Sequence, residues 1–225
     1  MQPRLLDDEV TFAPPADAGA ADGRLLVIAC GAIAREVLAV IRLNGWTHVT
    51  LQCLPGKLHN TPKKIAGAVD HKLRDAEASG RFDDMFVAYA DCGSAGALDA
   101  VLDEHGVERL PGDHCYGFFA GVDVFAAMHE ANPYTFYLTD FLCRHFDRLV
   151  VQGLKIDVHP ELLSAYFGNY RTLVYLSQTD DPALVERARA AASFLGLEFE
   201  HRRTGYGDLQ PSLEAFVGGG VGGRR

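Results

Sequence analysis

The chain has 225 residues, of which 48% are hydrophobic, a composition that suffices for one globular domain with an ordinary core. The formal net charge is -9 at pH 7 without a Lys/Arg stripe, which argues against nucleic-acid and membrane-surface binding and leaves a small-molecule substrate. No apolar run approaches the roughly 20 residues that cross a bilayer, and the N-terminus lacks a signal-peptide pattern, so we expect a cytoplasmic protein.

Three regions are expected along the chain. Residues 1–23 are acidic and rich in Pro and Ala, with few large apolar residues, and predict a disordered N-terminal arm. Residues 24–210 are expected to form a single α/β domain. Residues 211–225 end in a Gly-rich stretch and predict a flexible C-terminal tail.

Apolar runs of strand length alternate with segments whose apolar residues recur at helical spacing. We expect strands at 25–29, 49–53, 82–90, 107–110, 134–138, 173–176 and 197–201. Helices are expected between them, at 32–43, 62–78, 95–105, 116–131, 141–151 and 181–195. This alternation predicts an α/β fold with an open, mostly parallel sheet of about five to seven strands and helices on both faces.

The cysteines fall at particular places in this scheme. Five cysteines, an odd number without an export signal, do not predict a disulfide framework. Cys30, Cys53, Cys92 and Cys115 each follow a predicted strand, and the carboxyl ends of parallel strands share the edge where α/β proteins bind ligands. Cys53 precedes an apolar Leu-Pro pair and Cys143 lies within a helix, so we assign both to the core.

The remaining thiols predict a metal site. Cys30, Cys92 and Cys115, together with His114, supply the sulfur and nitrogen ligands of a tetrahedral zinc site, although their spacing matches no known finger or ribbon. An iron–sulfur cluster is the alternative cofactor for the same residues. The competing interpretation of each cysteine is a small buried apolar residue.

A second account needs no metal. Cys92 precedes a predicted helix, whose dipole lowers the pKa of a thiol, and His114 would act as its base. Asp140, after the fifth predicted strand, either caps the next helix or orients the imidazole of His114.

Four further residues are candidates for holding a cofactor or substrate. Gly93 begins a small-residue turn that suits a phosphate, or only a tight turn. His59 reaches the same sheet edge, or is a surface histidine of a loop. Arg35 and Glu36, in the first turn of a helix, would bind an anionic substrate or pair with each other.

Several blocks of the sequence resemble a bacterial and archaeal family designated domain of unknown function 1638. The blocks are ACGAIAREV, LPGKLHNTP, YADCGSAGALD, LPGDHCYGFFAG, FYLTDFLCRHFDRLV and HPELLSAYFGNYRTLVYLSQ. Members of that family are often found near corrinoid-dependent methyltransferases of methylamine or betaine metabolism, so the resemblance implies one-carbon chemistry. Ala90 departs from the pattern, where Gly is usual, as does Lys155-Ile156, where Gly-Leu is usual.

Taken together, the residues and the resemblance predict a metal-binding enzyme, a metal-dependent transferase of methyl metabolism with zinc preferred. One alternative is a metal-free enzyme with a cysteine nucleophile. Another is a non-catalytic carrier of a metal or corrinoid that serves a methyltransferase, with a corrinoid protein or methyltransferase as its partner and the corrinoid coming from that partner.

Overall fold

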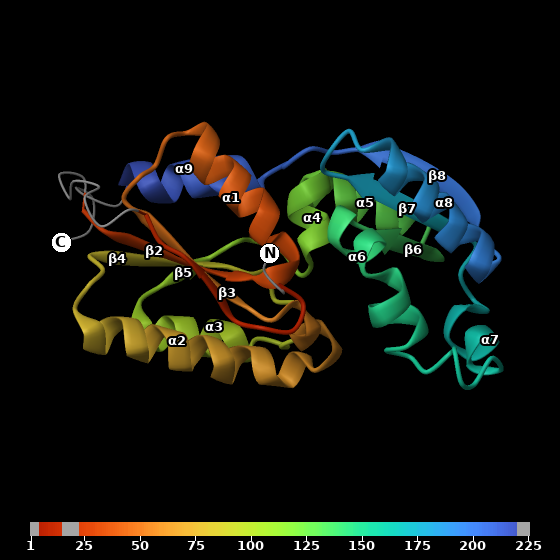
Figure 1. Cartoon of the computed structure of the whole chain (residues 1–225), viewed down its shortest axis with the longest axis horizontal. Helices are drawn as coiled ribbons and strands as arrows, with labels where there is room; N and C mark the ends of the chain where they lie inside the picture. Colours follow the sequence, from red (N-terminus) through yellow and green to blue (C-terminus); the bar gives the residue numbers. More distant parts are fainter. Residues whose placement is uncertain (1–4, 15–22, 220–225) are drawn as a thin grey trace. The chain divides into compact units, whose positions relative to one another are not determined.

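The computed structural model describes residues 5–14 and 23–219. Its chain divides into two compact units, one formed by residues 1–115 and 208–225 and the other by residues 116–207. Each unit is built around its own parallel sheet (Figure 1). Among the described residues, no helix combines the length and the apolar character that a bilayer-spanning segment needs.

The first unit contains a five-stranded sheet in the order β1-β3-β2-β4-β5. All neighbouring strands are parallel except β1, which runs antiparallel to β3. The strands are β1 (Val10–Phe12), β2 (Leu25–Cys30), β3 (Val49–Leu54), β4 (Asp84–Ala88) and β5 (Glu108–Arg109). Every residue of β2 is buried, as expected for a central strand that is covered on both faces.

Four long helices cover this sheet. Figure 1 shows α1 (Ala34–Leu43) and α9 (Leu209–Gly219) on one face, and α2 (Ile65–Ser79) and α3 (Ala97–His105) on the other. Each helix buries a stripe of apolar residues; α2, for example, buries Ile65, Val69 and Leu73 at helical spacing. Phe216 of α9 stacks on Phe86 of β4 with ring centroids 5.1 Å apart, which anchors the last helix to the sheet.

The second unit contains a three-stranded parallel sheet in the order β6-β7-β8. The strands are β6 (Thr135–Leu138), β7 (Thr172–Ser177) and β8 (Glu198–Arg203). The helices of this part are α4 (Cys115–Ala120), α5 (Val122–Ala131), α6 (Asp140–Arg144), a π-helical turn (Asp147–Val151), α7 (Leu162–Phe167) and α8 (Pro182–Leu195).

Alternate residues of this second sheet enter two different apolar clusters. Leu173 and Tyr175 pack with residues of α6 and α8, whereas Val174 and Leu176 pack with Tyr116 and Phe125. The sheet is therefore buried on both faces, in keeping with its parallel strands. The edge strand β8 is largely exposed and carries charged side chains, which discourage pairing with another chain.

The predicted α/β class, with mostly parallel strands and flanking helices, is confirmed. The strands, however, are shared between two sheets in two compact units, where the sequence predicted a single domain over 24–210. The predicted helix at 116–131 is interrupted at Gly121, whose φ of +88° leaves the helical region.

The two ends of the chain also differ from expectation over the residues described. Within the arm predicted at 1–23, Val10–Phe12 is an edge strand, and Leu5 and Leu6 are buried. Within the tail predicted at 211–225, the chain continues α9 to Gly219 and buries Leu213 and Phe216. Few apolar residues are enough to order these two segments, because each packs onto a sheet or loop that the rest of the chain forms. The rest of both predictions lies outside the described residues.

Candidate functional site

Four thiol and imidazole side chains follow four successive parallel strands of the first unit. Cys30 is the last residue of β2, and His59 lies in the 3-10 helix η3 (Gly56–Asn60) after β3. Cys92 lies in the turn after β4, and Cys115 begins α4 after β5. Parallel strands bring these positions to one edge of the sheet.

The ring of His59 is the centre of this group. Its Nδ1 lies 3.1 Å from the carbonyl oxygen of Gly56 and 3.5 Å from Sγ of Cys30. A carbonyl only accepts hydrogen bonds, so Nδ1 carries the proton. The side chains of Cys92 and Cys115 also lie close enough to the ring to raise its pKa. Three cysteine side chains therefore lie near one imidazole.

The charges of Cys30 and His59 stabilise each other. Burial raises the pKa of Cys30, but the charge and hydrogen bond of His59, with the Ala32 amide and Tyr89, outweigh it, so this pKa is lowered. The negative charge of Cys30 raises the pKa of His59 well above its usual value, although burial opposes the change. The arrangement favours a thiolate beside an imidazolium. Burial instead raises the pKa of Cys115, partly offset by His59.

Tyr89 closes the inner side of the site. Its side chain is 1% exposed and lies beside Cys30, to whose lowered pKa it contributes. Among the described residues its hydroxyl has no hydrogen-bond partner of regular geometry. Buried hydroxyl groups without a partner are rare in folded proteins and often mark a place where a ligand or ion binds.

The carboxylate of Asp91 shapes the turn that carries Cys92. It accepts hydrogen bonds from the amides of Gly93, Ala95 and Gly96 and from the hydroxyl of Ser94, at 2.6–3.1 Å. Burial raises the pKa of Asp91, but these hydrogen bonds outweigh it and lower that pKa to about 2. The cradle that the sequence predicted for a phosphate at Gly93 is therefore filled by the chain's own carboxylate, and Cys92 itself takes a φ of +51°.

Backbone hydrogen bonds join the two loops that carry Cys92 and Cys115. The amide of Asp91 donates to Gly112 and the amide of Cys92 donates to Asp113, at 3.1 and 2.8 Å. Arg109 pairs with Asp99 and also donates to the carbonyl groups of Leu110 and Gly112. In addition to the pairing of the short strand β5, these contacts set the distance between Cys92 and Cys115.

The N-terminal segment supports the loop that carries His59. The amides of Gly56 and Lys57 donate to the carbonyl groups of Leu5 and Leu6, at 2.9 and 3.0 Å. Gly31, directly after Cys30, leaves room for this segment, because a Cβ there would lie 2.1 Å from the Leu5 oxygen. Glycine is required at this position by the close approach of two backbones.

The structure corrects two of the predicted assignments. The imidazole among the thiols is that of His59, whereas the side chain of His114 is exposed. Asp140 belongs to the second unit, where its carboxylate accepts from Tyr175, the Gln178 amide and Thr179. The cap of α6 is Thr139, whose hydroxyl accepts from the Leu142 amide, so Asp140 is the first helical residue rather than the cap.

The other candidates have varied surroundings. Cys53 is 1% exposed and burial raises its pKa, which suits the predicted core role. Cys143 donates to the carbonyl of Leu184 at 3.2 Å, and burial raises its pKa to about 11. In the first turn of α1, Arg35 is exposed and Glu36 is 4% exposed.

Over residues 5–14 and 23–219, no group of three or more His, Cys, Asp or Glu side chains has an arrangement that would hold a metal ion as it stands. The donor chemistry of three sulfurs and one imidazole nitrogen suits zinc. Of the three sulfurs, Sγ of Cys30 lies 3.5 Å from Nδ1, the ring nitrogen that also bonds to Gly56.

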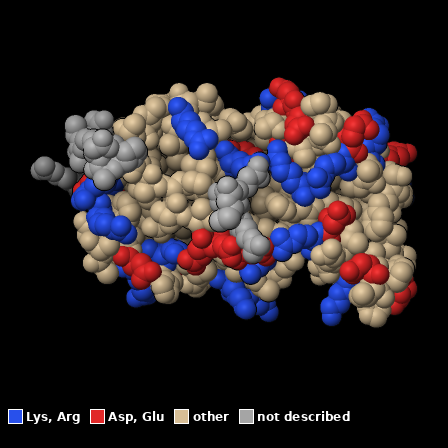
Figure 2. All heavy atoms as spheres, viewed as in Figure 1, with Lys and Arg blue, Asp and Glu red and all other residues tan. Residues whose placement is uncertain are grey.

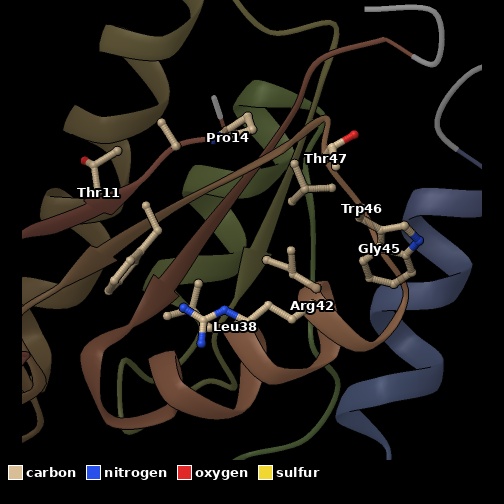
Figure 3. Close-up of a pocket in the computed structure, with 11 residues that line it drawn as sticks. Thr11, Pro14, Leu38, Arg42, Gly45, Trp46 and Thr47 are labelled. Carbon is tan, nitrogen blue, oxygen red and sulfur yellow. The ribbon is translucent and has the colours of Figure 1, made fainter. Parts of the chain in front are cut away.

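A pocket of about 600 Å³ lies elsewhere in the first unit, where β3 begins. Figure 3 shows Leu38 and Arg42 of α1, Trp46 and Thr47 of the following turn, and Pro14 at its wall. It contains no thiol or imidazole, and lies at the opposite end of β3 from the cysteine site. This pocket and the candidate chemistry are thus separate.

No curated protein matches the chain. Two solved structures of a "putative carboxylesterase" from Lactobacillus plantarum WCFS1 are distantly similar. The 1.70 Å structure is 11% identical with a TM-score of 0.30, over 95% of this chain and 92% of that chain. The 2.09 Å structure is 10% identical with a TM-score of 0.25, over 94% and 91%. At these values the likeness supports no statement about this chain.

One family model, described as "Protein of unknown function (DUF1638)", matches residues 53–213. The match confirms the resemblance predicted from the sequence blocks. It covers more than half of the chain and includes His59, Cys92 and Cys115, and it begins after Cys30. The chain therefore belongs to the DUF1638 family.

Proposed function

We propose that this protein binds a metal ion, with zinc preferred, through Cys30, His59, Cys92 and Cys115. The observation that carries the proposal is that three thiols from separate loops lie near one imidazole, with Sγ of Cys30 3.5 Å from its Nδ1 and Cys92 and Cys115 close enough to raise its pKa. For a single cysteine, burial as a small apolar residue is the simpler explanation. It does not explain why three cysteines meet the same ring.

The hydrogen bonding of His59 supports this role. Histidine ligands usually donate one ring N–H to a carbonyl or carboxylate group, which fixes the ring and leaves the other nitrogen for the metal. The Nδ1 of His59 has such a partner in Gly56. Metal binding would require the three sulfurs to converge on one point beside the other nitrogen, Nε2. Cys30, which lies 3.5 Å from Nδ1, would have to move to that side of the ring, as would Cys92 in its turn and Cys115 at the start of α4.

We further propose that the protein is an enzyme of methyl transfer, a reaction class that rests on the family resemblance. Zinc held by thiolates can bind a substrate thiolate or polarise a leaving group. Since four protein ligands fill a tetrahedral zinc ion, one of them must give way to substrate. Cys92 and Cys115, which are half-buried, are better placed to move than the buried Cys30.

The contact between Cys30 and His59 favours a second candidate, a metal-free enzyme with a thiolate nucleophile. The Sγ of Cys30 lies 3.5 Å from Nδ1 of His59 and accepts from the Ala32 amide at 3.4 Å. These are the partners that activate a cysteine. In this account the nucleophile is Cys30 with His59, where the sequence predicted Cys92 with His114.

Metal content separates the two candidates. Protein purified without added metal should contain about one equivalent of a transition metal by elemental analysis, if the site is a structural or catalytic zinc site. Replacing Cys30, Cys92 or Cys115 with Ser should each remove most of it. Cys143→Ser is the matched control, because serine can keep the hydrogen bond to Leu184.

Wild-type protein with less than about 0.2 equivalents of metal, also after incubation with zinc, would reject the metal site. Rapid alkylation of Cys30 by iodoacetamide, abolished in His59→Ala and unaffected by chelator, would then support the thiolate nucleophile. Retention of metal in all three Cys→Ser variants would reject this particular set of ligands.

A further inference from the structure

Lysines are concentrated beside the cysteine site. Lys57, Lys63 and Lys64 are three of the five lysines in the chain, although the net charge is -9. All three side chains are exposed, and within the described residues none has an acidic partner. By contrast, Lys72 pairs with Glu9 at 2.6 Å. Figure 2 shows both basic and acidic side chains over each unit on the face that it draws.

These lysines lie on the segment that carries His59. Lys57 belongs to the same 3-10 helix as His59, two residues away, so their Cα atoms are within about 8 Å. Lys63 and Lys64 belong to the next 3-10 helix, η4 (Pro62–Lys64). Its Pro62 lies 3.5 Å from the place where a Cβ of Gly93 would be, so η4 packs against the turn that carries Cys92.

The nearest carboxylates on the Cys92 side are already engaged. Asp91 turns inward and accepts four hydrogen bonds from residues 93–96. Asp99 is held by Arg109 at 2.6 Å. Asp113, which is exposed, remains as an acidic residue close to Cys115, and Asp7 and Asp8 follow the Leu6 carbonyl that binds Lys57. Within the described residues, none of these carboxylates forms an ion pair with the three lysines, so the ammonium groups remain available to an anion.

We infer that the substrate of this site is a small anion, a carboxylate or a phosphate, attracted by Lys57, Lys63 and Lys64. The inference deepens the proposed function, since it assumes that the cysteine site is where the substrate reacts. Ammonium groups without partners beside a half-buried site raise the local concentration of an anion. By Coulomb's law, a unit charge about 8 Å from the reacting atom would contribute about twofold at low salt, and three such charges about tenfold.

Alkylation with two reagents tests the inference without requiring bound metal. Iodoacetate is an anion and iodoacetamide is neutral. The same thiolate attacks the carbon of either reagent and displaces iodide, so the thiolate fraction cancels in the ratio of the two rates. The ratio is measured by mass spectrometry on chelator-treated, desalted protein, at whichever of Cys30, Cys92 and Cys115 reacts fastest. N-acetylcysteine amide provides the reference ratio for a neutral thiol.

We expect the ratio in the protein to exceed the reference about tenfold at low salt and to approach it in 1 M NaCl, where the Debye length is about 3 Å. Each Lys→Gln substitution at 57, 63 or 64 should lower the ratio about twofold. Asp113→Asn should raise it, and Lys155→Gln in the second unit is the control. Protection by propionate or by inorganic phosphate, at equal ionic strength, distinguishes the two kinds of anion.

A ratio equal to the reference, or unchanged in the triple Lys→Gln variant, overturns the inference. Elemental analysis of the same preparations keeps the two proposals apart. A raised ratio in a protein that binds no metal leaves the anion inference standing and rejects the metal. Bound metal together with a ratio equal to the reference leaves the metal proposal standing and rejects the anion inference.

Discussion

The ring of His59 is held by the Gly56 carbonyl, which accepts from Nδ1 at 3.1 Å, and Sγ of Cys30 lies 3.5 Å from the same nitrogen. The negative charge of Cys30 then raises the pKa of His59, and the positive charge of His59 lowers the pKa of Cys30. The sequence predicted His114 rather than His59 as the metal ligand, because His114 neighbours Cys115. Sequence adjacency, however, does not determine in which direction a side chain leaves a turn.

Replacing Tyr89 with Phe tests whether its hydroxyl serves the site or the fold. Because this hydroxyl has no regular hydrogen bond among the described residues, its loss should leave the free energy of unfolding within about 1 kcal/mol of wild type in urea. Release of zinc to a chelator should become about fivefold faster, as expected when a hydrogen bond of about 1 kcal/mol to a thiolate is lost. Tyr137→Phe, in the second unit, is the control. A large loss of stability with unchanged metal release would show a structural role.

Replacing Asp91 with Asn should loosen the turn that carries Cys92. An amide cannot accept at both of its ends, so part of the hydrogen bonding with Gly93, Ala95 and Gly96 is lost, and we expect destabilisation of about 1–2 kcal/mol. Because folding lowers the pKa of Asp91 to about 2, its contribution is present above the unfolded pKa of about 3.9 and is lost as pH falls through 2. Urea unfolding of both proteins between pH 2 and 6 measures this difference. A constant difference over that range would contradict the account.

At the scale of elements, α2 and α3 are joined by His105. Its ring lies between Asp70 at 2.9 Å and Glu77 at 2.6 Å, and the side chain is 7% exposed. The hydrogen bond that the ring donates to Asp70, followed by the one that it donates to Glu77, raises the pKa of His105. This group therefore contributes stability that is fully present below the unfolded pKa of about 6.5 and is lost as pH rises through the raised value.

The His105→Gln variant should accordingly be less stable than wild type by about 1 kcal/mol at pH 6, a value discounted for solvent screening. The difference should shrink toward pH 9. Thermal unfolding across this range would measure it, with His71→Gln, an exposed histidine on α2, as the control. A difference that grows with pH would have the wrong sign for this interaction.

The junction of β2, the N-terminal segment and the His59 loop depends on Gly31. Gly31→Ala places a methyl group 2.1 Å from the Leu5 oxygen, so backbone must shift, and we expect a loss of about 3 kcal/mol together with weaker metal binding. Gly67→Ala is the matched control, because it lies in α2 with no atom within 4 Å of the new methyl group and should stabilise by up to about 1 kcal/mol. Equal effects of the two substitutions would mean that Leu5 does not support the site.

At the scale of the whole molecule, the sequence predicted the strands better than their assembly. The buried run Leu25–Cys30 and the run Thr172–Ser177 were both recognisable as strands. Nothing in the alternation of strands and helices marks the boundary at Cys115, because a parallel sheet that continues and one that begins anew have the same local pattern. The short strand Val10–Phe12 was missed because three residues carry no periodicity.

The candidate site was predictable in part for the same reason. The ends of strands can be recognised from sequence, so Cys30, Cys92 and Cys115 could be predicted to lie at one edge of the sheet. The position of His59 depends on a 3-10 turn and on the buried Leu5–Leu6 segment, which follow from contacts distant in sequence. Asp140 was assigned to the same edge only because one sheet was assumed where there are two.

The central claim is that Cys30, His59, Cys92 and Cys115 bind one metal ion together. Zinc-edge X-ray absorption of the purified protein tests it most directly, because sulfur and nitrogen ligands have different distances to the metal. We predict three sulfur ligands at about 2.3 Å and one nitrogen at about 2.0–2.1 Å, with one sulfur lost in Cys92→Ser. A spectrum with only oxygen or nitrogen ligands, or one unchanged in Cys92→Ser, would contradict the claim.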